Sequence, residues 1–256
     1  MRSIIRSVIR KLGLYSTAVN VENKLGNYLN KGKRLNMYSD FIKKGDLVFD
    51  IGANEGNRTD IFLSLGAKVV AVEPQAECIA KLEAKFGDKI DIVKKGLDEQ
   101  EGKKLLYKSD SSLISSFNKD YIDSVKDDRF KGANWEAAGE LEMTTIDKLI
   151  DKYGVPAFCK IDVEGFEQQV LKGLSRPLQS LSYEFVVPEN RSNALECLTL
   201  LMKQGNIECN FSFGESMDLA LGAWKSGKDM LDYVQTKEFE SYSYGDIYVR
   251  FIEEIG

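Results

Sequence analysis

The sequence contains no histidine among its 256 residues, and this absence excludes several catalytic designs. A Ser-His-Asp triad, a Cys-His pair and a histidine-ligated metal all need an imidazole. A general base must therefore be a carboxylate, a lysine, a tyrosine or water. Cysteine is scarce as well, and no CxxC pair is formed by Cys78, Cys159, Cys197 and Cys209. We expect neither a disulfide framework nor a zinc site, and a reducing cytoplasm as the compartment.

Long hydrophobic runs and excess basic charge are also missing. No apolar run reaches about 18 residues, so we expect no membrane-spanning helix. The 35 lysines and arginines against 40 acidic residues give a formal net charge of -5. Because proteins that bind nucleic acid usually carry a basic excess, we expect no nucleic-acid partner. The length suits one domain with a sizeable core.

The N-terminus has an amphipathic pattern. On a helical wheel the apolar and basic side chains of residues 1–15 fall on opposite faces: Ile4, Ile5, Val8, Ile9 and Leu12 against Arg2, Arg6 and Arg10. One interpretation is peripheral contact with an anionic membrane surface. The other is a helix packed on the domain or on a partner. We predict that residues 1–40 form an N-terminal helical extension to a single domain at 41–256.

From Gly45 onward, short apolar runs alternate with stretches of helical periodicity. The expected strands and helices follow one another in the order 47–51, 57–65, 68–73, 75–86 and 90–95. Such alternation is typical of βαβ units and a parallel sheet. We therefore predict an α/β fold with a doubly wound, mostly parallel sheet of seven strands.

Residues 108–140 interrupt this alternation. The segment is rich in serine and charge, and carries the aromatic residues Phe117, Tyr121 and Trp135. Because aromatic side chains need burial, we expect an inserted loop or lid rather than a disordered linker. A lid here would shape an acceptor site, and its aromatic rings are candidates for stacking on a sugar.

The first strand runs into a glycine-bearing turn at Asp50-Ile51-Gly52-Ala53-Asn54-Glu55-Gly56. The turn lacks the middle glycine that lets a dinucleotide-binding backbone approach a pyrophosphate. A ligand without phosphates fits better, and a nicotinamide-dependent oxidoreductase is the disfavoured alternative. The predicted cofactor-binding residues of the turn are Asp50, Gly52, Ala53, Asn54 and Gly56. Asp50 and Asn54 would hold either the turn or the ligand's ammonium.

Acidic residues at the ends of the next two strands extend this site. Glu73 ends the second strand, where a carboxylate accepts both hydroxyls of a ribose. Asp98 follows the third strand, in a loop expected near the adenine. There either its carboxylate or the backbone of Leu97 would bind the base. Together these positions predict a nucleoside at the carboxyl ends of adjacent strands.

Four segments, in order, resemble the FkbM-type family of S-adenosylmethionine-dependent class I methyltransferases: FDIGANEGNRT, VVAVEP, TTIDKL and KIDVEGFEQQVLKGL. The resemblance covers roughly residues 45–187, and KIDVEG followed by a helix is its most specific part. It implies a Rossmann-like fold, S-adenosylmethionine as cofactor and methyl transfer to a hydroxyl. The acceptor implied is a small molecule or glycan, often a sugar in glycan or secondary-metabolite assembly.

Acidic residues follow the fourth strand. Strand alternation places Lys160, Asp162 and Glu164 on one side until the turn at Gly165. An alcohol loses its proton as it attacks a methyl group, and a carboxylate within reach can accept that proton. Asp162 is the first candidate for this base and Glu164 the second. Lys160 either orients the acid or, with a depressed pKa, acts itself. The non-catalytic alternatives are that Glu164 caps the next helix and that Asp162 only binds the cofactor.

Glu184 stands inside the fifth strand, among apolar residues. A buried acid costs free energy unless it is paired, so it is expected to pair with Lys160 or to reach the site as a third acid. A solvated edge position is the alternative. No acid–amide pair follows this strand except Glu189-Asn190, and we expect no metal. A non-catalytic cofactor-binding or scaffold protein remains as an alternative, which the strand-end acids disfavour.

Overall fold

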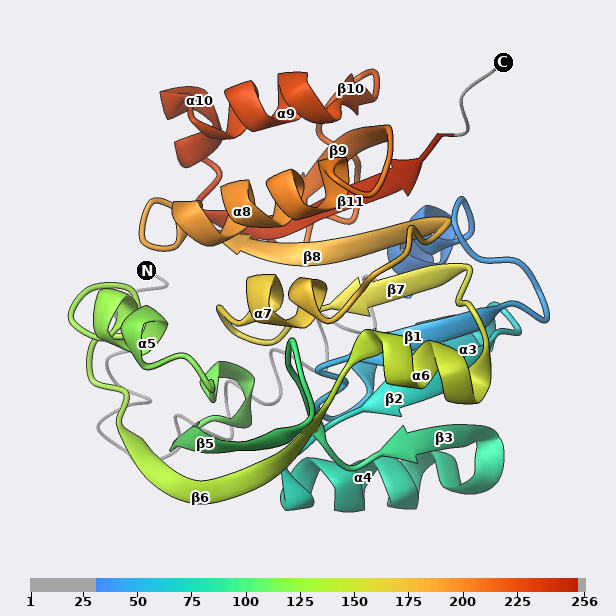
Figure 1. Cartoon of the computed structure of the whole chain (residues 1–256), viewed down its shortest axis with the longest axis vertical. Helices are drawn as coiled ribbons and strands as arrows, with labels where there is room; N and C mark the ends of the chain where they lie inside the picture. Colours follow the sequence, from blue (N-terminus) through green and yellow to red (C-terminus); the bar gives the residue numbers. More distant parts are fainter. Residues whose placement is uncertain (1–30, 253–256) are drawn as a thin grey trace, which may run out of the picture.

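The computed structural model describes residues 31–252, built on an eight-stranded sheet (Figure 1). The strand order is β10-β9-β11-β8-β7-β1-β2-β3. The strands are β1 (Leu47–Ile51), β2 (Lys68–Val72), β3 (Ile90–Val93), β7 (Phe158–Ile161), β8 (Ser180–Val186), β9 (Ile207–Phe213), β10 (Lys225–Ser226) and β11 (Tyr244–Phe251). The five adjacent strands β8, β7, β1, β2 and β3 are parallel to one another. Strand β11 is antiparallel to both of its neighbours.

The mostly parallel sheet predicted from the sequence is confirmed, but the count of seven strands is wrong by one. The additional strand, β10, has two residues and pairs with the edge of β9. So short a strand carries no period-2 pattern, and it leaves no mark in the sequence.

Helices cover both faces of the sheet. The helices are α3 (Asn57–Ser64), α4 (Ala76–Phe86), α5 (Lys119–Val125), α6 (Ile146–Tyr153), α7 (Glu167–Lys172), α8 (Arg191–Met202), α9 (Gly227–Val234) and α10 (Lys237–Glu240), and residues 31–38 are also helical. Helix 31–38, α3 and α4 pack on one face, while α6, α7, α8 and α9 pack on the other. This arrangement makes the fold doubly wound, as predicted.

Strand β1 shows why these residues form a central strand. Val48 packs with Tyr38 and Phe62 on one face, and Phe49 and Ile51 join the core on the other. A strand buried on both faces is expected to be almost entirely apolar, and Asp50 is the one charged residue of β1. Each fully buried side chain of this size contributes about 1.5–3 kcal/mol to the stability.

A smaller sheet of three strands stands beside the main one. Its order is β4 (Gly96–Leu97), β6 (Trp135–Thr144), β5 (Gly102–Ser109). Between β5 and β6 the chain forms the short 3₁₀ helix η2 (Ser112–Ile114) and then α5. Figure 1 shows this segment beside the ends of β1 and β7. The interval 108–140 thus contains ordered elements, and its action as a lid stays a prediction.

The direction in which successive strands extend the sheet reverses at β1. From there β2 and β3 extend the sheet one way, and β7 and β8 extend it the other way. The connections after β1 and β7 therefore leave the sheet in opposite directions and open a crevice between them. The amide of Asp162 donates to the carbonyl of Ile51, so the two strand ends emerge side by side.

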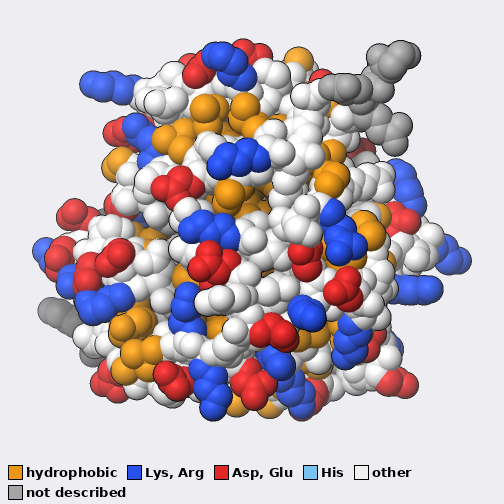
Figure 2. All heavy atoms as spheres, viewed as in Figure 1, with side chains coloured by type: hydrophobic (Ala, Val, Ile, Leu, Met, Phe, Trp, Pro, Cys, Tyr) orange, Lys and Arg blue, Asp and Glu red, His pale blue; other side chains and the backbone are white. Residues whose placement is uncertain are grey.

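The predicted N-terminal helical extension, residues 1–40, lies only partly within the described residues. The amphipathic residues 1–15 lie outside the described part of the chain, and helix 31–38 packs on the sheet through Tyr38. Within residues 31–252, no helix has the length and apolar character needed to cross a bilayer. On the face drawn in Figure 2, basic and acidic side chains are interspersed over the described surface.

Candidate active site

A cleft of about 650 Å³, including its open mouth, lies at the carboxyl ends of β1, β2 and β7. The cofactor-binding residues predicted from the sequence that line it are Gly52, Asn54, Glu73, Leu97 and Asp162. Glu164 lines it as well.

The glycines of the turn are required for two different reasons. Gly52 has φ +77°, and a Cβ there would lie 1.8 Å from the carbonyl oxygen of Asp162. Gly56 has φ +76°, and its Cβ would lie 2.4 Å from Phe86 and 2.8 Å from Leu82 of α4. Gly52 therefore permits the close approach of two strand ends, whereas Gly56 permits helix packing and does not line the cleft.

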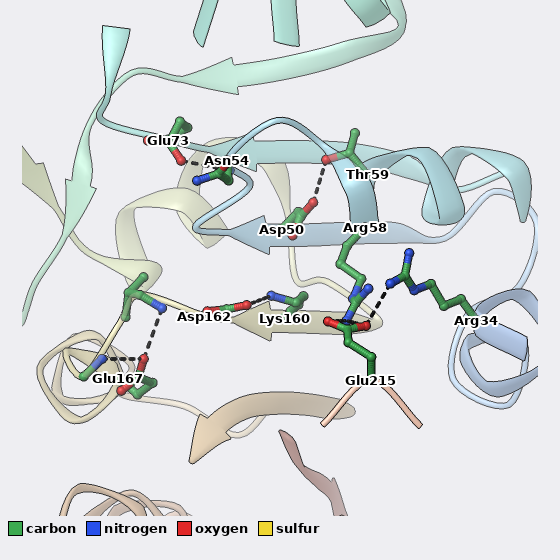
Figure 3. A network of polar contacts seen from close by, with 12 residues as sticks. Arg34, Asp50, Asn54, Arg58, Thr59, Glu73, Lys160, Asp162, Glu167 and Glu215 are labelled. Atoms are coloured by element: carbon green, nitrogen blue, oxygen red, sulfur yellow. Dashed lines mark hydrogen bonds and ion pairs between the residues drawn. The ribbon is translucent and has the colours of Figure 1, made fainter. Parts of the chain in front are cut away.

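Two other predicted residues of the turn lie beneath the cleft. Asp50 is buried and accepts a hydrogen bond of 2.5 Å from the hydroxyl of Thr59, which ties β1 to α3 (Figure 3). Burial raises the pKa of Asp50, against the opposing charge of Lys160. Ala53 packs in a cluster with Ala71 of β2 and Leu82. Neither side chain lines the cleft. Of the two roles predicted for Asp50, holding the turn agrees with its hydrogen bond to Thr59.

Glu73 is held in place at the cleft wall with only 2% of its surface exposed. Its two carboxylate oxygens accept the backbone N–H groups of Asn54 (2.9 Å) and Gln75 (2.8 Å). Burial raises the pKa of Glu73 to about 7, although both hydrogen bonds act in the opposite direction. Each oxygen keeps a lone pair for a ligand.

Part of the cleft wall was not predicted. Ser112 and Ser115 of the η2 region and the aromatic ring of Phe166 line it, beside Phe117, which the sequence named as a candidate for stacking on a sugar. The amide oxygen of Gln75, also on the wall, is buried with no hydrogen-bond partner in the described chain. These residues come together from distant parts of the sequence and share no local pattern.

Asp98 lies outside the cleft. Its carboxylate binds the ammonium of Lys104 at 2.6 Å and accepts the N–H of Glu99 at 2.8 Å. The wall near the expected adenine position is formed instead by the preceding residue, Leu97. Of the two residues predicted to contact the adenine, Leu97 and not Asp98 therefore lines the cleft.

On the other side of the cleft, Lys160 fixes Asp162. The lysine is 3% exposed, and its Nζ donates to Oδ2 of Asp162 at 2.7 Å, while Asp162 is 33% exposed (Figure 3). Burial alone lowers the pKa of Lys160, but the acids around it, Asp162 first, outweigh this and raise the pKa overall. The depressed pKa that a lysine base needs is contradicted, so Lys160 remains as the group that orients Asp162.

The turn that presents Glu164 is held by an acid that the sequence did not single out. One oxygen of Glu167 accepts the N–H groups of Val163 (3.1 Å) and Gly165 (3.2 Å), and the other accepts the amide of Asn193 (2.7 Å). Helix α7 has no side-chain cap. Glu167 rather than Glu164 therefore satisfies the free amides before this helix.

Glu184 is a third acidic residue beside Asp162 and Glu164. One carboxylate oxygen of each lies within 4.8 Å of the other two. Glu184 is half-buried in β8, directly opposite Asp246 of β11. Desolvation raises the pKa of both Glu164 and Glu184, and the neighbouring acids act in the same direction. The predicted third-acid position of Glu184 is the one observed, since Lys160 binds Asp162.

Of the three aromatic side chains singled out in the inserted segment, Phe117 lines the cleft, whereas Tyr121 is buried. Tyr121 is 3% exposed, and its ring lies 2.3 Å from where a Cβ on Gly165 would stand. The indole N–H of Trp135 donates to the carbonyl of Ile114 at 2.7 Å. The prediction that Tyr121 stacks on a sugar is therefore wrong, because its ring is buried against the turn.

On the face of the sheet that helix 31–38 and α3 cover, an ion-pair network joins helix 31–38 to the domain (Figure 3). Glu215, after β9, binds Arg34 at 2.8 Å and Arg58 of α3 at 2.9 Å. This network fixes the described part of the N-terminal region to α3 and lies outside the cleft.

Solved methyltransferases show a distant likeness to the chain. A TehB-like SAM-dependent methyltransferase from Corynebacterium glutamicum is 10% identical, with a TM-score of 0.47 over 93% of this chain and 99% of that one. A precorrin-6y C5,15-methyltransferase from Geobacter metallireducens is 11% identical, with a TM-score of 0.43 over 86% and 87%. A putative rRNA methylase from Clostridium thermocellum is 13% identical, with a TM-score of 0.45 over 87% and 96%. So distant a likeness carries no argument about the acceptor.

No curated protein matches the sequence. The family described as methyltransferase FkbM domain matches residues 50–235, well over half of the chain. The match spans the glycine turn, Glu73 and the three clustered acids. The resemblance seen in the sequence motifs is thereby confirmed, and the doubly wound sheet is that of a Rossmann-like class I methyltransferase. The chain belongs to the FkbM methyltransferase domain family.

Proposed function

We propose that the protein transfers a methyl group from S-adenosylmethionine to a hydroxyl, that of a sugar in a glycan or a secondary metabolite. The observation that carries this proposal is that Glu73 and the Lys160-bound Asp162 line one cleft at the switch point of the sheet. One side of the cleft thus suits a nucleoside, and the other offers an acid for proton transfer.

The cofactor side of the cleft fits an adenosine ligand. Glu73 has lone pairs free for both ribose hydroxyls, and Leu97 and Phe117 supply an apolar wall for the adenine. Gly52 and Asn54 lie where the methionine part would bind. The unpartnered amide oxygen of Gln75 is a further acceptor on this wall. S-adenosylmethionine, when bound, supplies the electrophilic methyl group.

On the acceptor side, Asp162 would receive the proton. The hydroxyl of the acceptor would lose its proton as it takes the methyl group from the sulfonium, and Asp162 is the group that would accept this proton. Lys160 holds that carboxylate at 2.7 Å and so fixes its direction before the acceptor arrives. Fixed geometry of this kind supplies a large part of the rate in transfer reactions.

The proposal is tested by calorimetry followed by a transfer assay. S-adenosylhomocysteine should bind in the micromolar range and raise the melting temperature, whereas NAD should do neither. Labelled S-adenosylmethionine should then give labelled product with glycan or sugar acceptors that carry free hydroxyls. Saturable NAD binding without any response to S-adenosylhomocysteine would overturn the proposal in favour of an oxidoreductase. Cofactor binding without transfer to any hydroxyl would favour a binding or scaffold role.

A further inference from the structure

Glu164 lines the cleft in a backbone conformation that residues other than glycine rarely adopt. Its φ is +55°, and the next residue, Gly165, follows with a φ of +83°. A left-handed conformation costs free energy for a residue with a Cβ, and it persists only where the surrounding structure enforces it. Such residues cluster at active sites. The contacts that enforce this conformation are therefore candidates for a role in the reaction.

Two side chains of the inserted segment make these contacts. The hydroxyl of Ser116 donates to the carbonyl of Glu164 at 2.6 Å, and the side-chain amide of Asn118 donates to the carbonyl of Gly165 at 2.7 Å. The ring of Tyr121 packs beside them, since a Cβ on Gly165 would stand 2.3 Å from it. The insert thus fixes the two peptide groups that follow Glu164.

Both donors are themselves held in place. The backbone of Ser116 exchanges two hydrogen bonds with that of Tyr107 in β5, at 2.9 and 3.0 Å. The hydroxyl of Ser116 also accepts the N–H of Asn118 at 2.9 Å. The side-chain oxygen of Asn118 accepts the N–H of Tyr121 at 3.1 Å and so caps α5. Because each donor is fixed by its own segment, the pair can impose a conformation on the turn after β7.

We propose that Ser116 and Asn118 are positioning residues, which hold Glu164 in its left-handed conformation and so direct its carboxylate to the acceptor side of the cleft. Both bind backbone carbonyls, and neither lines the cleft. Their effect on transfer therefore passes through the turn. Their neighbours Ser115 and Phe117 do line the cleft. The segment that forms part of the wall thus also orients the acid on that wall.

This inference deepens the proposed function and rests on it in one step, which is that Glu164 contacts the acceptor. A carboxylate oxygen of Glu164 lies within 4.8 Å of one of Asp162. Glu164 can therefore bind the acceptor beside the hydroxyl whose proton Asp162 receives. A displacement of about 1 Å in such an orienting contact can cost about 10²-fold in rate. Loss of either donor should lower transfer without weakening cofactor binding.

The backbone of Glu164 is tested by thermal melting of the full chain, which needs no acceptor. Alanine stabilises an ordinary position relative to glycine, whereas at a φ of +55° the order reverses. Glu164→Gly should therefore melt about 2–4 °C above Glu164→Ala. Glu196, exposed on helix α8, is the control, and there the glycine variant should melt below the alanine variant. The same order at both positions would overturn the proposal.

Asn118→Ser separates the contact with the turn from the helix cap. Serine caps a helix as well as asparagine does, but it lacks the amide that binds Gly165. Hydrogen exchange at the N–H groups of Val163 and Gly165 should become about 10-fold faster. The affinity for S-adenosylhomocysteine should change little. Ser124→Ala removes a hydroxyl of α5 that binds the carbonyl of Tyr121 at 2.7 Å, and it should leave the exchange unchanged. Unchanged exchange in Asn118→Ser contradicts the proposal.

A double-mutant cycle in the transfer assay separates positioning from a merely structural role. With a sugar acceptor that the wild type methylates, Asn118→Ser should lower kcat/KM for the acceptor by about 10–100-fold, and Ser124→Ala should not. In a chain that carries Glu164→Ala, Asn118→Ser should have little further effect, because the side chain that it positions is gone. Losses that multiply would overturn the proposal. If the wild type methylates no hydroxyl, the proposed function falls, while melting and exchange still decide whether the insert holds Glu164.

Discussion

Gly52 lies so close to the backbone carbonyl of Asp162 that a Cβ added to Gly52 would stand 1.8 Å from that oxygen. The cofactor turn after β1 and the acid after β7 are therefore in contact through backbone atoms. A side chain added at Gly52 would therefore displace the backbone of Asp162 on the other side of the cleft.

The first prediction concerns this contact. Gly52→Ala should destabilise the protein by more than about 2 kcal/mol, because it adds a clash to a φ of +77°. S-adenosylhomocysteine binding should be lost with it. Gly222→Ala is the matched control, since a Cβ there meets nothing within 4 Å and its change should stay within about 0.5 kcal/mol. Urea unfolding and calorimetry check both variants, and a stable Gly52→Ala with normal affinity contradicts the contact.

The second prediction follows from the pKa of Glu73, which burial raises from its usual 4.5 to about 7. The folded state holds this proton more tightly than the unfolded state. The contribution of Glu73 to stability is therefore present below pH 4.5 and is lost as the pH rises to 7. Relative to Glu73→Gln, the ligand-free wild type should lose about 1–3 kcal/mol of unfolding free energy between pH 5 and pH 8. Urea unfolding at both pH values measures this.

Cofactor binding should show the opposite dependence on pH. The ionised form of Glu73 accepts both ribose hydroxyls, so S-adenosylhomocysteine should bind more tightly as the pH rises from 6 to 8. Glu73→Gln should bind about 1.5–3 kcal/mol more weakly at pH 8, and should lack that slope. If both proteins respond to pH alike, Glu73 does not hold the ribose.

The strand-end residues of the site were predictable for a general reason. The carboxyl ends of parallel strands meet at one edge of a sheet, so Glu73 and Asp162 had to come near each other once the strands were identified. The residues that were missed act through contacts between distant segments. Ser112 lies near Asn54, 58 residues earlier, and Glu167 binds Asn193, 26 residues later. Asp98 does not reach the cleft because its carboxylate binds Lys104 of strand β5.

The third prediction tests how Glu167 positions the turn. Glu167→Gln places an amide N–H₂ against the amide of Asn193, so a buried donor loses its acceptor and stability should fall by about 1–3 kcal/mol. Asn193→Asp in the same chain supplies an acceptor again and keeps the acceptor for the N–H of Gln168. The double variant should recover most of the loss, which a double-mutant cycle in urea measures. Additive losses would mean that this hydrogen bond does not hold the turn.

The last prediction concerns the base. Asp162→Asn keeps the size of the side chain and removes its charge, while Lys160 can still donate to the amide oxygen. If Asp162 accepts the acceptor proton, kcat should fall by about 10²–10⁴, the usual contribution of general-base catalysis. The affinity for S-adenosylhomocysteine should change little, because Glu73 on the other wall is untouched. Single-turnover assays at saturating cofactor measure the rate, with Glu189→Gln as the control. Near-normal turnover in Asp162→Asn, together with an inactive Glu164→Gln, would assign the base to Glu164. The chain has no histidine to take the role, so activity in both variants would leave the proton to water or to Glu184.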